Sequence, residues 1–292
     1  MSVIRPVRKA VFPVAGLGTR LLPATKTMPK EMLTVVDRPL IQYAVDEARE
    51  AGIEQLIFVT GRGKSSLVDY FDYGFELETT MAKAGKSRAA LDASRTTPGE
   101  LISVRQQQPL GLGHAVWCAR ELVGREPFAV LLPDVLIQAT QSCTAQMVEA
   151  YQATGEAANI IAVEEVPKDQ VSSYGVVGVG ERKGKSFRIT GMVEKPKPAD
   201  APSNLIITGR YILQPEIFDL LETQQKGAGG EIQLTDALLR LLEKQPGYGF
   251  QFDGRTFDCG SKLGFLSANV AYALARDDIA PAFRSELKKL LG

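Results

Sequence analysis

The chain has 292 residues, enough for one large domain with a sizeable hydrophobic core. Its 34 basic and 34 acidic side chains cancel, so no global field favours nucleic acid and positive charge has to act locally. Three widely spaced cysteines and a single histidine, His114, exclude a zinc site built from these residue types. No run approaches the ~18 apolar residues of a membrane helix. We therefore expect a protein of a reducing, cytoplasmic setting with neither nucleic-acid nor membrane partners.

Strands and helices alternate over the first 165 residues. Runs of strand length, mostly apolar as parallel strands buried on both faces require, stand at 10–15, 54–60, 101–107, 127–134 and 158–166. Helical patterns lie between them, at 39–51, 65–72, 111–124 and 143–155. This alternation predicts an α/β fold with a Rossmann-like, doubly wound and mostly parallel sheet. Ligands of such sheets lie beyond the carboxyl ends of the strands, so functional side chains are expected near Gly16, at 106–108 and at Asp134.

The regular alternation of strands and helices ends after residue 165. Strand-like runs at 174–180, 186–196 and 205–213 have little helix between them and predict a mixed extension of the sheet that covers the site. Helical patterns return at 215–223, 231–245, 261–277 and 281–292. Without repeats or a clean linker, we expect one domain over residues 1–292.

Two segments leave alternatives open. The polar stretch 79–99 is either a mobile flap or a pair of surface helices. The amphipathic C-terminal helices either pack on a partner subunit or cover the chain's own core.

The run GLGTR directly after the first strand favours an anion site. Glycines at a strand's end let backbone N–H groups approach an anion closely, and Arg20 offers a planar fork that suits phosphate oxygens. Lys26 and Lys30 follow on a loop that two prolines stiffen and prevent from forming one continuous helix. Together these residues predict a polyphosphate site.

Two better-known phosphate motifs do not fit the chain. The dinucleotide fingerprint needs a third glycine that is missing after GLG, which argues against a dehydrogenase. The run GRGKSS at 61–66 lacks the first glycine of a Walker loop, because Phe58 stands there. We interpret this run as a helix entry with a serine cap, whose exposed Arg62 and Lys64 are alternative phosphate contacts.

The run AGLGTRLLPATKTMPKEML, followed by VVDRPLIQYAVDEA, resembles the signature of sugar-nucleotide pyrophosphorylases, which are nucleotidyltransferases acting on sugar 1-phosphates. The form with PATK and PKEM is similar to the bacterial UTP–glucose-1-phosphate uridylyltransferases in particular. The likeness continues in order through QQQPLGLGHAV, LLPDVLI, YGVV, VEKPKP, TGRYIL, GGEIQLTDAL and FDCGSKLGF, and covers nearly the whole chain. It implies a nucleotidyltransferase (glycosyltransferase-A-like) fold, with a nucleotide-binding half at about 8–165 and a sugar-binding and C-terminal half at about 166–292.

The resemblance implies Mg²⁺-dependent transfer of a uridylyl group from UTP to glucose 1-phosphate, giving UDP-glucose and pyrophosphate by direct attack on the α-phosphorus. A phosphate monoester is already anionic near neutral pH, because its second pKa is about 6, so the reaction needs no general base. Fixed cations and a metal ion should supply most of the catalysis. We also expect a homo-oligomer, a dimer or tetramer.

Two other functions remain open. The first is a glucose-1-phosphate thymidylyltransferase, because the one methyl group that separates thymine from uracil is a weak discriminator. The second is a non-catalytic sugar-nucleotide sensor. Such a protein would be expected to lack Arg20, Lys30 or Asp134, and all three are present.

The resemblance also implies roles for individual residues. The transferred and leaving phosphates are contacted by Arg20 and Lys30, with Lys26 in second place. The nucleotide is bound by Ala15, Gly16, Gly18, Thr19, Glu31, Gln108, Gly111 and Gly113. The sugar phosphate is bound by Gly175, Glu194, Lys195, Gly209 and Glu231. The metal is held by Asp134 and Asp258.

Several of these residues have a plain structural alternative. Asp258 is equally typical of a helix N-cap or a loop carboxylate, and Gly175 and Gly209 of strand bulges or close packing. Asp134 is followed by a valine where some relatives have a second aspartate, so metal binding relies more on Asp134 and Asp258.

Overall fold

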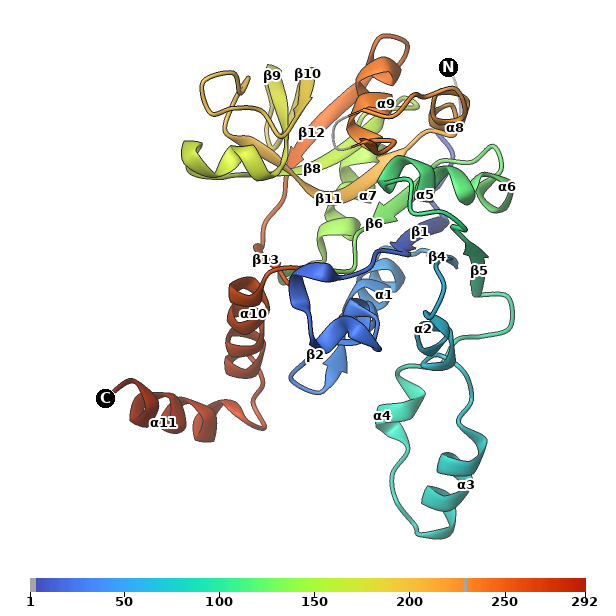
Figure 1. The fold of residues 1–292 in the computed structure, drawn as a ribbon, viewed down its shortest axis with the longest axis vertical. Helices are drawn as coiled ribbons and strands as arrows, with labels where there is room; N and C mark the ends of the chain where they lie inside the picture. The colour runs from blue at the N-terminus through green and yellow to red at the C-terminus, as the bar shows by residue number, and fades with distance from the viewer. Residues whose placement is uncertain (1–3, 228–229) are drawn as a thin grey trace.

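A nine-stranded sheet runs through the computed structural model, which describes residues 4–227 and 230–292 (Figure 1). Across the sheet the strands are β5 (Leu101–Arg105), β4 (Gln55–Thr60), β1 (Lys9–Val14), β6 (Phe128–Leu131), β11 (Leu205–Leu213), β8 (Asn159–Glu165), β12 (Gly247–Gln251), β10 (Ser186–Glu194) and β9 (Gly175–Lys183). Among these strands, β10 and β11 run against the others. The predicted α/β fold with a mostly parallel sheet is confirmed.

Helices cover both faces of the sheet, because neighbouring residues of each central strand point to opposite sides. On one face, Val11 and Ile57 share a core with α5 (Leu112–Cys118), α8 (Ile217–Glu222) and α9 (Leu234–Leu242). On the other face, Phe12 and Phe58 pack with α1 (Leu40–Glu50), α2 (Ser65–Asp69) and α7 (Cys143–Ala153). Burial on both sides explains the unbroken apolar runs of these strands.

The predicted mixed extension is present, but β11 does not lie at its edge. This strand inserts between β6 and β8 and pairs with both in antiparallel fashion. All nine of its residues are buried, as a central position in the sheet requires. The second half of the chain therefore shares the sheet of the first half, and loops of both halves meet along one rim.

Several short elements had no sequence signal. They are the strands β2 (Thr34–Val35), β3 (Arg38–Pro39), β7 (Val135–Gln138), β12 and β13 (Arg255–Asp258), and the 3-10 turns Thr19–Leu21, Ala24–Lys26, Lys30–Met32 and Lys168–Ser173. The sequence GYGFQ of β12 is too rich in glycine for a strand pattern. The ring of Phe187 occupies the space that a Cβ at Gly249 would need, which explains that glycine.

Several predicted helices are shorter than expected, among them the one at 231–245, which covers only Leu234–Leu242. The segment 111–124 divides at Ala119 into α5 and α6 (Arg120–Val123). The helix expected at 65–72 ends at Asp69. Its start also corrects the predicted serine cap, since Ser65 is already helical and Lys64 stands at the N-cap without a side-chain cap bond.

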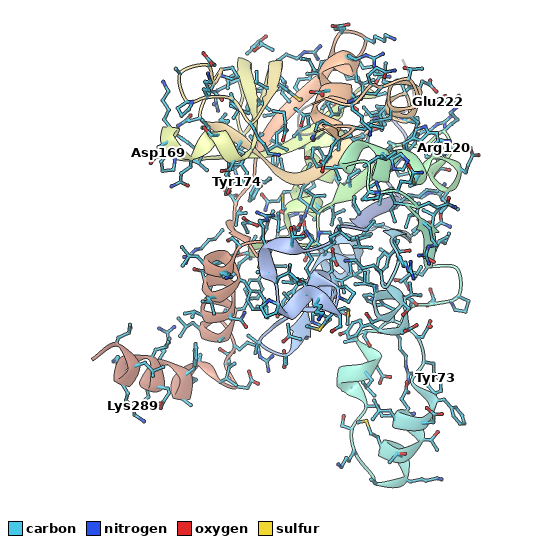
Figure 2. The ribbon with its side chains drawn as sticks, in the orientation of Figure 1. Tyr73, Arg120, Asp169, Tyr174, Glu222 and Lys289 are labelled. Atoms are coloured by element: carbon cyan, nitrogen blue, oxygen red, sulfur yellow. The ribbon has the colours of Figure 1, made fainter. Side chains whose placement is uncertain are left out.

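The polar stretch 79–99 belongs to a pair of surface helices, the second of the two alternatives. It carries most of α3 (Phe75–Lys83) and all of α4 (Ala89–Asp92). Figure 1 shows these helices on an arm that projects from the body of the molecule, and Figure 2 shows Tyr73 on the same arm.

The two C-terminal helices behave differently. Helix α10 (Lys262–Leu274) packs beside β13 and β2, where Ala268 joins a small core with Val35 and Phe257. Helix α11 (Ala280–Leu291) has no buried residue and lies apart from the sheet, with Lys289 on it (Figures 1 and 2). Within the described part of the chain, no helix combines the length and apolar character needed to cross a membrane.

Candidate active site

Loops from both halves of the chain enclose a cleft of about 370 Å³ beyond the carboxyl ends of β6 and β8. This is the edge where open α/β sheets bind ligands. The predicted site residues that line the cleft are Arg20, Asp134, Gly175, Glu194, Lys195, Gly209 and Asp258. Side chains that are 175 residues apart in sequence, Arg20 and Lys195, therefore face one space.

The glycine-rich loop after β1 folds back on itself. Gly18 has a φ of 67°, a left-handed conformation that favours glycine. Its carbonyl accepts a hydrogen bond from Thr25 Oγ1 at 2.7 Å. A Cβ at Gly18 would lie 3.2 Å from the Cβ of Lys30, so the glycine also lets the loop close against that lysine.

Lys30, which does not itself line the cleft, forms an ion pair with Asp134, which does. The ammonium nitrogen of Lys30 lies 2.5 Å from Asp134 Oδ2, and both side chains are largely buried. Burial opposes the ionisation of Asp134, but the ammonium of Lys30 holds the pKa of that carboxyl below its ordinary value. Burial likewise opposes the charge on Lys30, but Asp134 and Glu31 raise its pKa. The pair is thus fully charged near neutral pH.

The second aspartate and the arginine lie beside this pair. Arg20 Nη1 is 3.7 Å from Asp258 Oδ2. A Cβ at Gly260 would lie 2.7 Å from Arg20 Nη2, 3.0 Å from Asp258 Oδ1 and 3.2 Å from Asp134 Oδ2. One guanidinium and two carboxylates therefore surround the same point, and glycine leaves room for them.

The helix N-cap alternative for Asp258 is wrong. Ser261 caps α10, with its Oγ accepting from the N–H of Gly264 at 3.1 Å. The carboxylate of Asp258 instead accepts from the N–H of Gly260 at 3.0 Å and keeps its other oxygen toward Arg20.

The sugar-side wall carries an acid and a base at the end of β10. Glu194 Oε2 accepts from Thr235 Oγ1 at 2.8 Å, and Glu194 Oε1 lies 3.4 Å from Lys195 Nζ. Lys195 has a φ of 49°, which costs a non-glycine residue about 1–3 kcal/mol and is typical of functional sites. Its N–H donates to the carbonyl of Tyr174 at 3.0 Å, which holds the strained residue at the rim of the cleft.

The glycines of this wall are required by packing. A Cβ at Gly175 would lie 3.1 Å from Glu194 Oε2 and 3.0 Å from Ile207 Cδ1. Gly209 has a φ of 76° within a register shift of β11, and a Cβ there would lie 2.9 Å from Leu132. The bulge and close-packing alternatives therefore describe both positions.

A family model described as nucleotidyl transferase matches residues 9–274. The chain belongs to the nucleotidyl transferase family. The family resemblance seen in the sequence and the nucleotidyltransferase fold it implied are thereby confirmed.

Individual relatives agree closely with this assignment. The chain is 54% identical over 263 residues to a UTP–glucose-1-phosphate uridylyltransferase of Komagataeibacter xylinus, covering 89% of this chain and 92% of the relative. It is 46% identical over 291 residues to the protein of the same name from Bacillus subtilis (strain 168), covering 98% and 99%.

Solved structures give the same result. A UTP-bound UGPase from Acinetobacter baumannii superposes with a TM-score of 0.89 at 46% identity, covering 97% of this chain and 99% of the other. A UDP-glucose pyrophosphorylase complexed with UDP-glucose gives a TM-score of 0.84 at 44% identity, covering 92% and 100%. A structure named as a putative glucose-1-phosphate thymidylyltransferase from Bacillus anthracis, at 24% identity and a TM-score of 0.71, shares the nucleotidyltransferase fold and supports no more than that.

Some predicted residues of this nucleotidyltransferase lie outside the lining of the cleft. Gln108 is exposed and lines a separate hollow beside α5, with His114 and Trp117. Lys26 and Glu231 are exposed and do not border the cleft either. Gln108 and Glu231 were assigned to the site from sequence motifs alone. A motif does not define the turn geometry that sets the direction of each side chain.

Gly111 and Gly113 pack against the chain itself. A Cβ at Gly111 would lie 2.7 Å from Glu231 Cβ, and one at Gly113 would lie 2.8 Å from the carbonyl oxygen of Ile232. The N–H of Gly113 donates to that carbonyl at 2.8 Å. These glycines therefore leave room for residues 231–232 to pack against the start of α5.

The expected exposure of Lys64 is wrong, whereas Gln106 lies within the range 106–108 where functional side chains are expected. Lys64 was expected to be exposed, but it is buried and its Nζ lies 2.7 Å from Glu31 Oε2. Gln106 is buried at the end of β5, where its Nε2 donates to the carbonyl of Gly111 at 3.0 Å. The pairing of Lys64 depends on tertiary structure and leaves no periodic trace in the sequence.

Acid should weaken the Lys30–Asp134 pair. The lowered pKa of Asp134 contributes stability that is fully present above the unfolded pKa of about 3.9 and is lost as the pH falls through the folded value. The free energy of unfolding of the wild type should therefore fall, relative to that of Asp134→Asn, as the pH is lowered from about 5 through the folded pKa of Asp134. Urea denaturation of both proteins at each pH measures this difference.

Glu100 provides a matched reference for this titration. It is 14% exposed and lies 2.7 Å from Arg49 Nε. Burial raises the pKa of Glu100, but the hydrogen bonds from Arg49 and Thr97 and the charge of Arg49 together lower it below its ordinary value. Glu100→Gln should reproduce the pH dependence. A difference for Asp134→Asn that stays constant with pH would contradict the assignment of a charged pair.

Proposed function

We propose that the chain transfers a uridylyl group from UTP to glucose 1-phosphate, forming UDP-glucose and pyrophosphate. The observation that carries this proposal is the single cleft that brings Arg20, Asp134 and Lys195 together. The names of the relatives, and the UTP and UDP-glucose bound in the solved structures, support the same substrates.

The chemistry requires two anions to meet. The phosphate of the sugar is already charged near neutral pH, so its oxygen attacks the α-phosphorus of UTP without a general base while the bond to pyrophosphate breaks. In the proposed roles, Lys195 binds the sugar phosphate, and Arg20 and Lys30 offset the charge that builds on the transferred and leaving phosphates. Glu194, fixed by Thr235, accepts hydrogen bonds from sugar hydroxyls.

Enzymes of the nucleotidyl transferase family generally use a divalent metal, and we propose Mg²⁺ for this chain. Asp134 and Asp258 fit such an ion, because their oxygens border one point beside Gly260 and Mg²⁺ takes only one or two carboxylates, with substrate phosphates completing its shell. The described residues hold no cluster of three or more His, Cys, Asp or Glu side chains. When bound, the ion would neutralise charge on phosphate oxygens.

The buried carboxylate of Glu31 supports a base-binding role. One of its oxygens pairs with Lys64, while Oε1 is buried and has no hydrogen-bond partner. Burial raises the pKa of Glu31 against the effect of Lys64 and Lys30. An N–H donor of a pyrimidine base would satisfy the open oxygen.

The backbone of the glycine-rich loop completes the proposed nucleotide site. Four residues follow the end of β1, namely Ala15, Gly16, Gly18 and Thr19. In the proposed site their N–H groups donate to phosphate oxygens.

The decisive experiment is pyrophosphate release by purified protein with Mg²⁺, glucose 1-phosphate and either UTP or dTTP. The proposal predicts release with UTP and formation of UDP-glucose in equal amount. Faster turnover with dTTP would instead establish the thymidylyltransferase alternative. No release with either nucleotide, despite binding of UDP-glucose, would establish a sensor.

Replacing Lys195 should mainly affect the sugar phosphate. Lys195→Ala is expected to lower kcat/KM for glucose 1-phosphate about 10- to 100-fold, because a hydrogen bond to a charged group contributes about 1.5–3 kcal/mol. The KM for UTP should change little. Lys197→Ala, an exposed lysine of the same segment that does not line the cleft, is the control and should behave like the wild type. Equal losses in both variants would contradict the role of Lys195.

We further propose a homo-oligomer built through the C-terminal helices, in a cytoplasmic setting. Helix α11 leaves Leu290 and Leu291 75% and 85% exposed, and α10 leaves Leu263 77% exposed. A second copy of the chain would cover these side chains. Sedimentation of the full chain and of a chain ending before α11 tests this, and a monomer in both cases would exclude it. The three cysteines are unpaired thiols, which supports a reducing compartment.

A further inference from the structure

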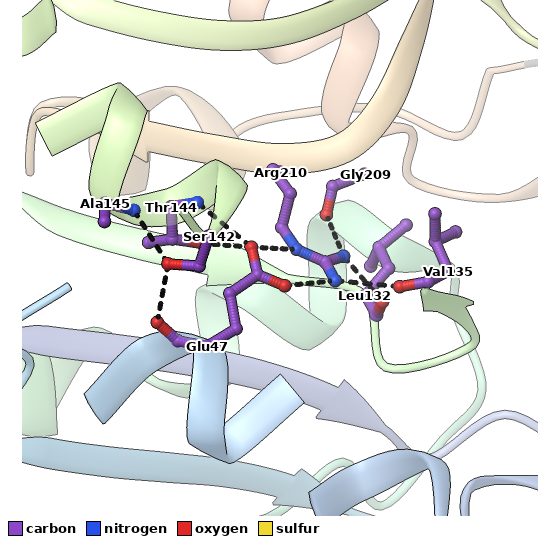
Figure 3. A network of polar contacts seen from close by, with 8 residues as sticks. All are labelled: Glu47, Leu132, Val135, Ser142, Thr144, Ala145, Gly209 and Arg210. Atoms are coloured by element: carbon purple, nitrogen blue, oxygen red, sulfur yellow. Dashed lines mark hydrogen bonds and ion pairs between the residues drawn. The ribbon is translucent and has the colours of Figure 1, made fainter. Parts of the chain in front are cut away.

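Arg210 is the largest fully buried side chain among the described residues, with 1% of its surface exposed. Its guanidinium lies beside Leu132 and Val135 (Figure 3), the residues that flank the Pro133–Asp134 turn in sequence. Nη1 donates to the carbonyl of Leu132 at 2.9 Å, and Nη2 donates to the carbonyl of Val135 at 2.7 Å. One planar group therefore fixes the backbone on both sides of Asp134.

A second carboxylate holds the guanidinium in place. Glu47 of α1 accepts from Arg210 Nε at 3.0 Å and from Nη2 at 2.8 Å, a bidentate pair. Glu47 Oε1 also accepts from the hydroxyl of Thr144 at 2.6 Å and from its N–H at 3.0 Å, at the start of α7 (Figure 3). The arginine is thus anchored by two helices that lie on the face of the sheet away from α5.

The backbone of β11 directs the arginine toward the turn. The pairing register of β11 with β8 shifts between Ile207 and Tyr211, and Gly209 within this segment has a positive φ. Bulges of this kind redirect a side chain next to a site. The carbonyl of Gly209 accepts from the N–H of Leu132 at 3.0 Å, so the same bulge ties the sugar-side wall to the turn of Asp134.

Stability alone does not explain the presence of the buried ion pair between Arg210 and Glu47. Buried ion pairs lose about as much in desolvation as they gain in attraction, and apolar residues of similar volume often stabilise a fold at least as well. A requirement to hold the turn of Asp134 in position explains why the charged side chain of Arg210 lies in β11, a strand whose nine residues are all buried.

We propose that Arg210, held by Glu47, is a positioning residue that fixes the carboxylate of Asp134 relative to the sugar-side wall. This inference rests on the proposed function for its kinetic consequences. It predicts that loosening the guanidinium lowers the rate of the chemical step while both substrates still bind.

Arg210→Lys is the main test, because lysine keeps the charge but has no planar fork to bridge Glu47 and two carbonyls. The expected result is a kcat about 10- to 100-fold lower, with KM values for UTP and glucose 1-phosphate within about threefold of the wild type. Hydrogen exchange in the protein without ligands should become faster in the peptide that contains the N–H of Val135, which donates to Leu132 in the wild type.

Arg49→Lys is a matched control. Arg49 also joins a carboxylate, Glu100 at 2.7 Å, to the carbonyls of Arg95 at 2.7 Å and Ala93 at 3.4 Å, and it does not line the cleft. This variant should keep the wild-type kcat and the wild-type exchange at Val135. If Arg210→Lys does not fold, Glu47→Gln serves as the test variant, with the same direction of effect.

The inference is overturned if the test variant keeps the wild-type kcat, or if its loss of kcat matches that of Arg49→Lys at an equal decrease in Tm. Wild-type exchange at Val135 in the test variant would also overturn it. Failure of the proposed function is distinguishable, because the wild type would then release no pyrophosphate while the exchange measurement would still show whether Arg210 holds the turn.

Discussion

Asp134→Asn is expected to lower kcat for pyrophosphate release about 10³-fold. The substitution removes the partner of Lys30, 2.5 Å away, and one of the two carboxylates that fit the metal ion. Loss of one fixed electrostatic group in an active site typically costs about 10²–10³ in kcat, and loss of metal affinity adds to it. Steady-state kinetics over a range of Mg²⁺ concentrations measures both effects, and the half-saturating concentration of Mg²⁺ should rise.

Glu100→Gln is the control for this prediction. Its carboxylate is as buried as that of Asp134 and is equally paired with a cation, but it lies outside the cleft. Its kcat should equal that of the wild type. Activity of Asp134→Asn within about tenfold of the wild type would remove Asp134 from the catalytic machinery.

Arg20→Ala is expected to lower kcat about 10²- to 10³-fold, with a smaller change in KM for UTP. The side chain of Arg20 is 66% exposed and lines the cleft beside Asp258, where its guanidinium can contact phosphate oxygens whose charge increases during transfer. An interaction that strengthens in the transition state appears in kcat more than in KM. Initial rates at saturating glucose 1-phosphate separate the two constants.

Arg38→Ala is the matched control for Arg20. Arg38 is 50% exposed and lies 3.4 Å from a carboxylate, Asp46, but it does not line the cleft. The two variants should have similar stability, because exposed ion pairs contribute little. If Arg38→Ala loses as much activity as Arg20→Ala, the effect of Arg20 is not local to the phosphates.

The first half of the fold could be predicted because its strands are buried on both faces. Such strands are continuous apolar runs, and the helices between them have a clear period. The insertion of β11 between β6 and β8 could not be predicted, since strand order depends on contacts between distant segments. The short pair β7 and β13 left no pattern, because four residues are too few for one. The extent of a single domain over residues 1–292 stays a prediction.

Some residues of the candidate site could likewise be predicted from the sequence, and others could not. Arg20, Asp134 and Lys195 follow recognisable strand ends or motifs, and the structure places all three in one cleft. Gln108 lines a separate hollow, because a motif gives residue order but not the direction of a side chain. Arg210 was missed because its partner Glu47 is 163 residues away, and a charged residue inside an apolar run gives no sign of its partner.

The most direct test of the proposed active site is a crystal structure of the protein with UDP-glucose and Mg²⁺. We expect the diphosphate of UDP-glucose to lie between Arg20 and Lys195, with the Mg²⁺ ion bound to Asp134 and Asp258. A nucleotide sugar whose phosphates lie away from these residues, or which binds outside the cleft, would contradict it.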